Sequence, residues 1–325
     1  MKIINHSLAA VLAFAALQTG TATAQADYPS KPIRFIVPFP AGGGTDIIAR
    51  HVANKMNDVP NWKTIVDNVA GAGGNIGLGV AAKAAPDGLT LVLGQTSNLA
   101  IAPSLYGKIP YDPVKDFAPV TLVTSVPVTF MVAADSPYKT LADLVKAAKT
   151  KPGEITFATS GNGTVAHLAT EMFKRTAGID MLHVPYKGAA AAFPDLIGGR
   201  VHVFVSSLET GIPQIKSKTV RALAVASMTR TTSVPDVPTF HESGYKNFEA
   251  LTWFGVLAPA GTPDAIVTRL SAEITKILKM PDVQEKFATT SGGEIKTGPK
   301  EFSALLKSEL VKWSKVVKES GAKLD

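Results

Sequence analysis

The stretch from Ile33 to Arg50 joins an apolar strand, a glycine loop and an amphipathic helix, and it constrains the fold more than any other part of this sequence. Ile48, Val52 and Met56 recur every fourth position, which gives the helix one apolar face. A strand that leads directly into a helix with a buried face is the building unit of α/β folds. We therefore expect this segment to be one βα unit of a helix-covered sheet.

The glycine loop of this unit suits an anion. Thr45 and Asp46 open the helix, and a helix start presents unpaired N–H groups and the positive end of the helix dipole. The glycines at 42–44 let a ligand approach the backbone closely. We interpret the loop as a candidate cradle for a small anion, with an ordinary strand-to-helix turn as the alternative.

A second glycine loop lies near the middle of the chain. An apolar strand is expected at 155–159, and Ser160–Thr164 then leads into a helix with apolar residues on one face. Strands and helices alternate through most of the sequence, which predicts largely parallel sheets flanked by helices. The sequence thus predicts an α/β fold in which each half carries its own strand, glycine loop and helix.

The predicted strands also suggest where the chain divides. We expect residues 27–124 and 251–325 to form a discontinuous first lobe, and residues 125–250 to form the second lobe. Two strands, near Val123 and near Phe254, would then cross between the lobes.

The first residues have the features of a signal peptide. Lys2 precedes an apolar run at 8–17, and small residues at 22–26 offer cleavage sites. We expect residues 1–26 to be removed on export and the mature protein to lie in the periplasm of a Gram-negative bacterium. No later segment is apolar for long enough to suggest a transmembrane helix.

Composition and missing motifs exclude several functions. The chain has no cysteine, so thiolate metal sites are excluded, and its formal net charge of +7 comes from scattered Lys and Arg. We expect no nucleic-acid partner, no metal and no cofactor. Neither a phosphate-binding P-loop nor a nucleophile elbow is present, and the six histidines form no metal-ligand pair. We expect a protein that is not an enzyme; the alternative is a secreted hydrolase using His167 with Ser160 or Ser207.

Several motifs together resemble those of the Bug (Bordetella uptake gene) family, the periplasmic binding components of tripartite tricarboxylate transporters. The resemblance covers essentially the whole mature chain. Its motifs are Tyr28–Asp46, Gly71–Gly77, Ala85–Gly88, Pro110–Phe117, Gly163–Leu168, Val184–Gly188 and Pro235–Phe240.

The resemblance implies a two-lobe periplasmic binding fold, type II-like, that closes on a small organic carboxylate. It implies a monomer that delivers its ligand to the membrane subunits of such a transporter; a sensor partner that presents ligand to a receptor kinase is the alternative. Together with the loops described above, it gives a candidate ligand-binding set: Phe39, Ala41, Gly42, Gly43, Thr45, Asp46, Ser97, Ser160, Asn162, Thr164, His167, Gly188, Ala189, Ala190, Ser206 and Ser207.

One departure from the family pattern bears on the ligand. Many relatives place Asp-Asn where this chain has Ser206 and Ser207. Without an acid at this point, we expect a dicarboxylate to bind better than an amino acid of similar length. An apolar or aromatic spacer would lie against Phe39 or Trp253. For Trp253, core packing is the default interpretation and a wall of the ligand cleft is the alternative. Dicarboxylates, tricarboxylates, aromatic carboxylates and nicotinate-like acids all remain open.

Overall fold

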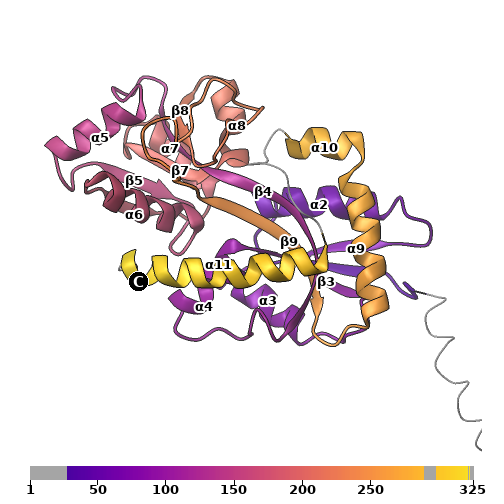
Figure 1. Cartoon of the computed structure of the whole chain (residues 1–325). Coiled ribbons are helices and arrows are strands. Elements are labelled where there is room, and N and C mark those ends of the chain that lie inside the picture. Colours follow the sequence, from indigo (N-terminus) through magenta and orange to yellow (C-terminus); the bar gives the residue numbers. More distant parts are fainter. Residues whose placement is uncertain (1–27, 289–297, 321, 323–325) are drawn as a thin grey trace, which may run out of the picture.

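The computed structural model describes residues 28–288, 298–320 and 322. Its strands form one curled mixed sheet in the order β2-β1-β3-β9-β4-β7-β5-β6, with β8 paired to β4. Helices cover this sheet at both ends (Figure 1). The signal peptide predicted for residues 1–26 lies outside the described residues. None of the helices in the described part is long and apolar enough to cross a membrane.

One half of the molecule, here called lobe 1, is built on β1, β2 and β3, and β1 pairs in parallel with the other two. Glycine loops lead from these strands into the helices that cover them. The elements of this half are β1 (Ile33–Val37), α2 (Gly44–Met56), β2 (Thr64–Asn68), η1 (Ala72–Gly74), α3 (Asn75–Ala82), β3 (Thr90–Gln95), the π-helix η2 (Ser97–Ile101), α4 (Ala102–Leu105), α9 (Asp264–Leu278) and α10 (Pro281–Ala288).

The other half, lobe 2, repeats this plan with β5 at its centre, paired in parallel with β6 and β7. A complete capping box between Thr140 and Asp143 starts its first helix, and the Thr-x-x-Asp spacing of these two residues is typical of one. Its elements are α5 (Leu141–Thr150), β5 (Thr156–Thr159), α6 (Val165–Ala177), β6 (Leu182–Pro185), α7 (Ala189–Ile197), β7 (Val203–Ser207), α8 (Leu208–Lys216) and β8 (Val220–Val225).

Two long antiparallel strands, β4 (Phe117–Ala133) and β9 (Leu251–Pro259), connect the lobes. The first half of β4 pairs with β9, and its second half pairs with β7 and β8 of lobe 2. The predicted α/β fold with parallel strands in each lobe is confirmed, and the antiparallel pairs that β4 and β9 add make the sheet as a whole mixed. The predicted lobe boundaries, after residues 124 and 250, stay a prediction; both positions lie on or beside these strands.

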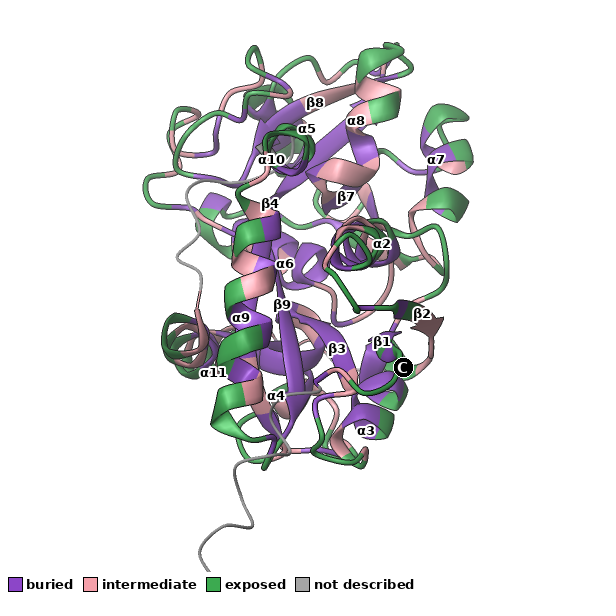
Figure 2. Cartoon of the chain, turned by 90° about the vertical axis from the view of Figure 1, so that its right-hand side faces the viewer, coloured by how far each residue is buried: buried purple, intermediate pink, exposed green. Residues whose placement is uncertain are grey.

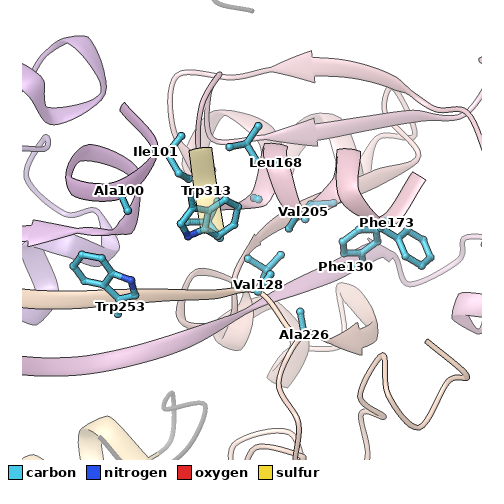
Figure 3. Packing of buried hydrophobic residues seen from close by; sticks show 14 of the residues in the cluster. Ala100, Ile101, Val128, Phe130, Leu168, Phe173, Val205, Ala226, Trp253 and Trp313 are labelled. Carbon is cyan, nitrogen blue, oxygen red and sulfur yellow. The ribbon is translucent and has the colours of Figure 1, made fainter. Parts of the chain in front are cut away.

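The C-terminal helix α11 (Pro299–Ser320) packs against both lobes. Trp313 is buried, with Ile101 of η2 to one side and Leu168 of α6 to the other (Figure 3). Glu309 accepts hydrogen bonds from the indole N–H groups of Trp313, at 2.8 Å, and of Trp253 on β9, at 3.0 Å. Its carboxylate thus ties α11 to the strand that crosses between the lobes.

Burial follows these layers closely. In Figure 2 the central strands β3, β4 and β9 are mostly buried and the edge strand β2 is only partly buried, whereas the outer sides of α9 and α11 are exposed. One apolar cluster joins side chains from both lobes, including Phe130, Phe173, Trp253 and Trp313. The two lobes therefore share a continuous core on the α11 side, and the loops at the strand ends lie away from it.

Candidate functional site

The loops that follow the parallel strands approach one another across the two lobes. In open α/β sheets, ligands bind outside the carboxyl ends of the strands. Gly163, in the second glycine loop, packs so closely on α4 of lobe 1 that a Cβ atom there would lie 2.5 Å from Leu105 Cδ2. Gly44, at the start of α2, packs as closely on lobe 2, where its neighbour is Glu209 of α8. These two contacts define a candidate site between the lobes.

Asp46 organises the first glycine loop from within. Its Oδ2 accepts from the Gly42 backbone N–H and from Arg50 Nε, each at 2.9 Å, and its Oδ1 accepts from Asn68 Nδ2 at 2.9 Å. Asn68 Nδ2 also donates to the Phe39 carbonyl at 3.0 Å. Burial acts to raise the pKa of Asp46, but these hydrogen bonds outweigh it and lower the pKa below its usual value.

Both carboxylate oxygens of Asp46 are therefore used inside lobe 1. The sequence places Asp46 in the ligand-binding set, which stays a prediction, and in the structure its carboxylate holds the shape of the loop. Residues 41–43 remain exposed, and within the described structure Gly43 begins α2 without a side-chain cap. The first turn of α2 therefore presents its backbone N–H groups at the cradle that the sequence predicts.

The second glycine loop is closed by its own side chains. Thr164 caps α6: its hydroxyl accepts from the His167 backbone N–H at 3.2 Å and donates to the Gly161 carbonyl at 2.9 Å. His167 Nδ1 accepts from the Gly163 N–H at 3.2 Å, and the imidazole stacks on His183 with ring centroids 4.0 Å apart. The predicted ligand contacts Thr164 and His167 thus have structural partners of their own.

The predicted serines of lobe 2 lie together. Ser160 Oγ and Ser206 Oγ are 3.4 Å apart, which brings the ends of β5 and β7 into contact. The Gly188 N–H donates to the Ser160 carbonyl at 3.3 Å, so the start of α7 joins the same group. Ser207 faces β9 instead, where its Oγ donates to Thr252 Oγ1 at 3.4 Å.

The remaining predicted residues are placed as follows. Ala189 and Ala190 open α7, Asn162 lies in the second glycine loop, and Ser97 begins η2 at the end of β3. Trp253 is buried in the core and donates to Glu309, which confirms the default interpretation of core packing and corrects the alternative of an aromatic wall. The Phe39 ring lies beside Gly74, where an added Cβ atom would be 3.2 Å from it.

Two polar side chains near this site were not predicted. Asn98 Nδ2 is buried beside Gly74 and has no hydrogen-bond partner among the described residues. The second is Glu209, in the first turn of α8, whose Oε1 lies 2.6 Å from where a Cβ atom on Gly44 would be. Glu209 stands two residues after Ser207, so the strand end that lacks the family's Asp-Asn does carry an acid nearby.

The carboxyl group of Glu209 is in an unusual environment. The residue as a whole is partly exposed, but Oε2 is buried, and no partner for it exists among the described residues. Burial raises the pKa of this carboxyl to about 7, against a small opposing effect of its own backbone N–H. In the described part of the chain, no group of three or more potential metal ligands occurs.

Comparison with known proteins places this architecture. Residues 48–322 match the family described as tripartite tricarboxylate transporter family receptor. Protein BugT of Bordetella pertussis is 39% identical over 323 residues, which cover 99% of each chain. A Rhodopseudomonas palustris protein solved with adipate gives a TM-score of 0.85 with 33% identity and covers 92% of this chain and 100% of the other.

A second R. palustris structure, MatC with bound malate, gives a TM-score of 0.81 with 30% identity and covers 89% of this chain and 100% of the other. These relatives are solute-binding proteins, and the resemblance to Bug proteins inferred from the motifs is confirmed. This chain belongs to the receptor family of tripartite tricarboxylate transporters, which includes the Bug proteins.

Proposed function

We propose that this protein is a periplasmic receptor that captures a small organic carboxylate between its lobes and delivers it to the membrane subunits of a tripartite tricarboxylate transporter. One observation carries the proposal. The start of α2, which has no side-chain cap in the described structure, lies where the two lobes meet and faces α8 of lobe 2. A helix start binds anions through free N–H groups and the helix dipole.

The mechanism follows from ligand contacts to both lobes. A carboxylate held at the α2 start by one end and by the loops of lobe 2 at the other favours the closed arrangement over an open one. The wrong ligand leaves buried polar groups unpaired, which costs about 1–3 kcal/mol for each group. Adipate and malate in the two R. palustris relatives support the carboxylate class.

We propose a receptor rather than an enzyme. In the hydrolase alternative, His167 would act as a base on Ser160 or Ser207. The nearest hydroxyl partners of these serines are Ser206 and Thr252, and the Gly163 N–H donates to His167 Nδ1. We also propose that the protein is exported by the predicted signal peptide and acts as a monomer.

A screen of carboxylates against the mature protein tests the proposed function. Ligand at 100 times its dissociation constant should stabilise the protein by about 2.7 kcal/mol, which shows as a raised melting temperature. Calorimetry on the hits should give one site per chain. A protein that turns over esters but binds no carboxylate stoichiometrically would contradict the proposal.

A further inference from the structure

Glu209 is a buried acceptor at the point where the two lobes meet. Its Oε1 lies against the Cα of Gly44, the first residue of α2, and its Oε2 is buried with no partner among the described residues. Buried carboxyl oxygens in proteins are almost always hydrogen-bonded, since an unpaired one costs free energy. An unpaired oxygen at the start of the anion-binding helix therefore indicates that a partner comes from outside the chain.

The surrounding residues do not supply that partner. Arg50 is the cation of α2 in this region, and its Nε is bound to Asp46 while its Nη2 donates to Asn68. The Ser206 and Ser207 hydroxyls, one turn before Glu209, lie by Ser160 and Thr252. Each polar side chain named here already has a partner, so Glu209 stays open to a donor on a ligand.

A glycine at position 44 is needed for this contact. Any Cβ at position 44 would lie 2.6 Å from Glu209 Oε1, which is closer than real Cβ atoms come to an oxygen. Gly43, the neighbouring residue, has room for a Cβ at ordinary contact distance, 3.5 Å from the Pro40 carbonyl oxygen. The glycine at 44 therefore lets the Glu209 carboxyl reach the α2 start.

We propose that Glu209 selects carboxylates that carry a hydrogen-bond donor, a hydroxyl or an ammonium, on the carbon beside the carboxylate. This inference rests on the proposed function. The carboxylate of the ligand lies at the α2 start, and its donor pairs with Glu209 Oε2. A ligand without the donor leaves this oxygen buried and unpaired beside a second carboxylate, which disfavours binding.

This selectivity replaces the expectation drawn from Ser206 and Ser207. That expectation favoured a plain dicarboxylate over an amino acid because the strand end carries no acid. Glu209 places an acid there from the next turn of the chain. When Glu209 is ionised, a plain dicarboxylate would meet its carboxylate without offering it a proton.

Matched acids that differ only at the carbon beside the carboxylate test the proposal. The sets are succinate, malate and aspartate; glutarate, 2-hydroxyglutarate and glutamate; and phenylacetate, mandelate and phenylglycine. Dissociation constants are measured by calorimetry for the wild-type mature protein and for Glu209→Gln, which keeps the size of the side chain. Glu154→Gln is the matched control, since Glu154 is exposed on lobe 2 and pairs only with Lys151 in the described structure.

In the set that fits, we expect the wild type to bind the donor-bearing acid at least tenfold more tightly than the parent acid. Glu209→Gln should reduce that ratio at least tenfold, while Glu154→Gln leaves it unchanged. The ratio is insensitive to a general loss of folded protein. Equal binding of parent and donor-bearing acids, or a ratio that Glu209→Gln does not change, overturns the inference but leaves the receptor function standing. If none of these acids binds to the wild type, the inference is overturned, and the carboxylate screen described above decides the proposed function.

Discussion

The two glycine loops look alike in sequence but differ in how their helix starts are used. In lobe 2, Thr164 caps α6 and His167 accepts from the Gly163 N–H, so side chains of the loop already occupy part of the helix start. In lobe 1, Asp46 holds the loop from behind and Gly43 leaves α2 without a side-chain cap in the described structure. We therefore propose the lobe 1 loop as the anion-binding one because its helix start has no side-chain cap in the described structure, a difference that glycine content alone does not reveal.

The comparison predicts that the lobe 1 loop depends most on a single side chain. Asp46→Ala removes the acceptor of three hydrogen bonds, from Gly42, Arg50 and Asn68, and leaves these donors without it. We expect a loss of about 3–4 kcal/mol in the free energy of unfolding, measured with urea. Asp67→Ala breaks the exposed pair with Arg34 and should cost less than about 1 kcal/mol. Equal losses for both variants would contradict the role given to Asp46.

The acid of lobe 2 should give the protein a distinct pH dependence. The pKa of Glu209 rises from its ordinary value of 4.5 to about 7 in the folded state, so the folded chain keeps this proton longer than the unfolded chain. The stabilisation is full below about pH 4.5 and is lost as the pH rises towards 7, by about 3 kcal/mol in total.

Urea unfolding between pH 4.5 and 8 measures this contribution. Glu209→Gln cannot ionise, so we expect its stability to lack the decrease that the wild type shows in this range. The pKa of Asp46 is lowered in the folded state, so its contribution to the free energy of unfolding is lost only at more acidic pH, where this carboxylate becomes protonated. Superimposable profiles of wild type and Glu209→Gln would show that the carboxyl of Glu209 is solvated.

The contact between the loops can be tested by a double-mutant cycle. Gly44→Ala places a Cβ against Glu209 Oε1 and should cost about 1–2 kcal/mol of stability. In a Glu209→Ala background the obstacle is gone, and the same change should be neutral or stabilise α2 slightly. Gly43→Ala is the matched control, because its Cβ has space. A cost of Gly44→Ala that persists without Glu209 would contradict the contact.

The smallest effect is expected at the capped loop. Thr164→Val removes the cap of α6 and the bond to Gly161, at a cost of about 1 kcal/mol. The sequence predicts that this hydroxyl contacts the ligand. The dissociation constants of wild type and variant, measured at a temperature where both are fully folded, distinguish the two roles. A tenfold or greater loss of affinity would favour direct contact with the ligand, and a nearly unchanged affinity would favour the capping role.

Much of the fold could be predicted because it depends on local patterns. The periodic helix at 44–56, the capping box at Thr140 and the crossing strands β4 and β9 all follow from neighbouring residues. The antiparallel pairs within each lobe were missed, because strand direction in a sheet depends on connections across the whole chain. The helix α8 was missed as well; Pro213 inside it hides the helical pattern.

The candidate site was harder to predict for a physical reason. The loops were found from their glycines, but whether Asp46 or Thr164 faces a ligand depends on which partners reach it. Glu209 meets Gly44 although 165 positions separate them in the sequence, and no local pattern marks that contact. For Trp253 two interpretations stayed open, because an aromatic residue on a crossing strand can face either the cleft or α11.

A crystal structure of the mature protein with a carboxylate identified by the screen would show directly where the ligand binds. We expect carboxylate oxygens within hydrogen-bond distance of backbone N–H groups in the first turn of α2, and we expect the same ligand to contact lobe 2. A carboxylate bound only at the start of α6, or in the separate groove of lobe 2 lined by Thr140, Arg221 and Ser243, would contradict this expectation.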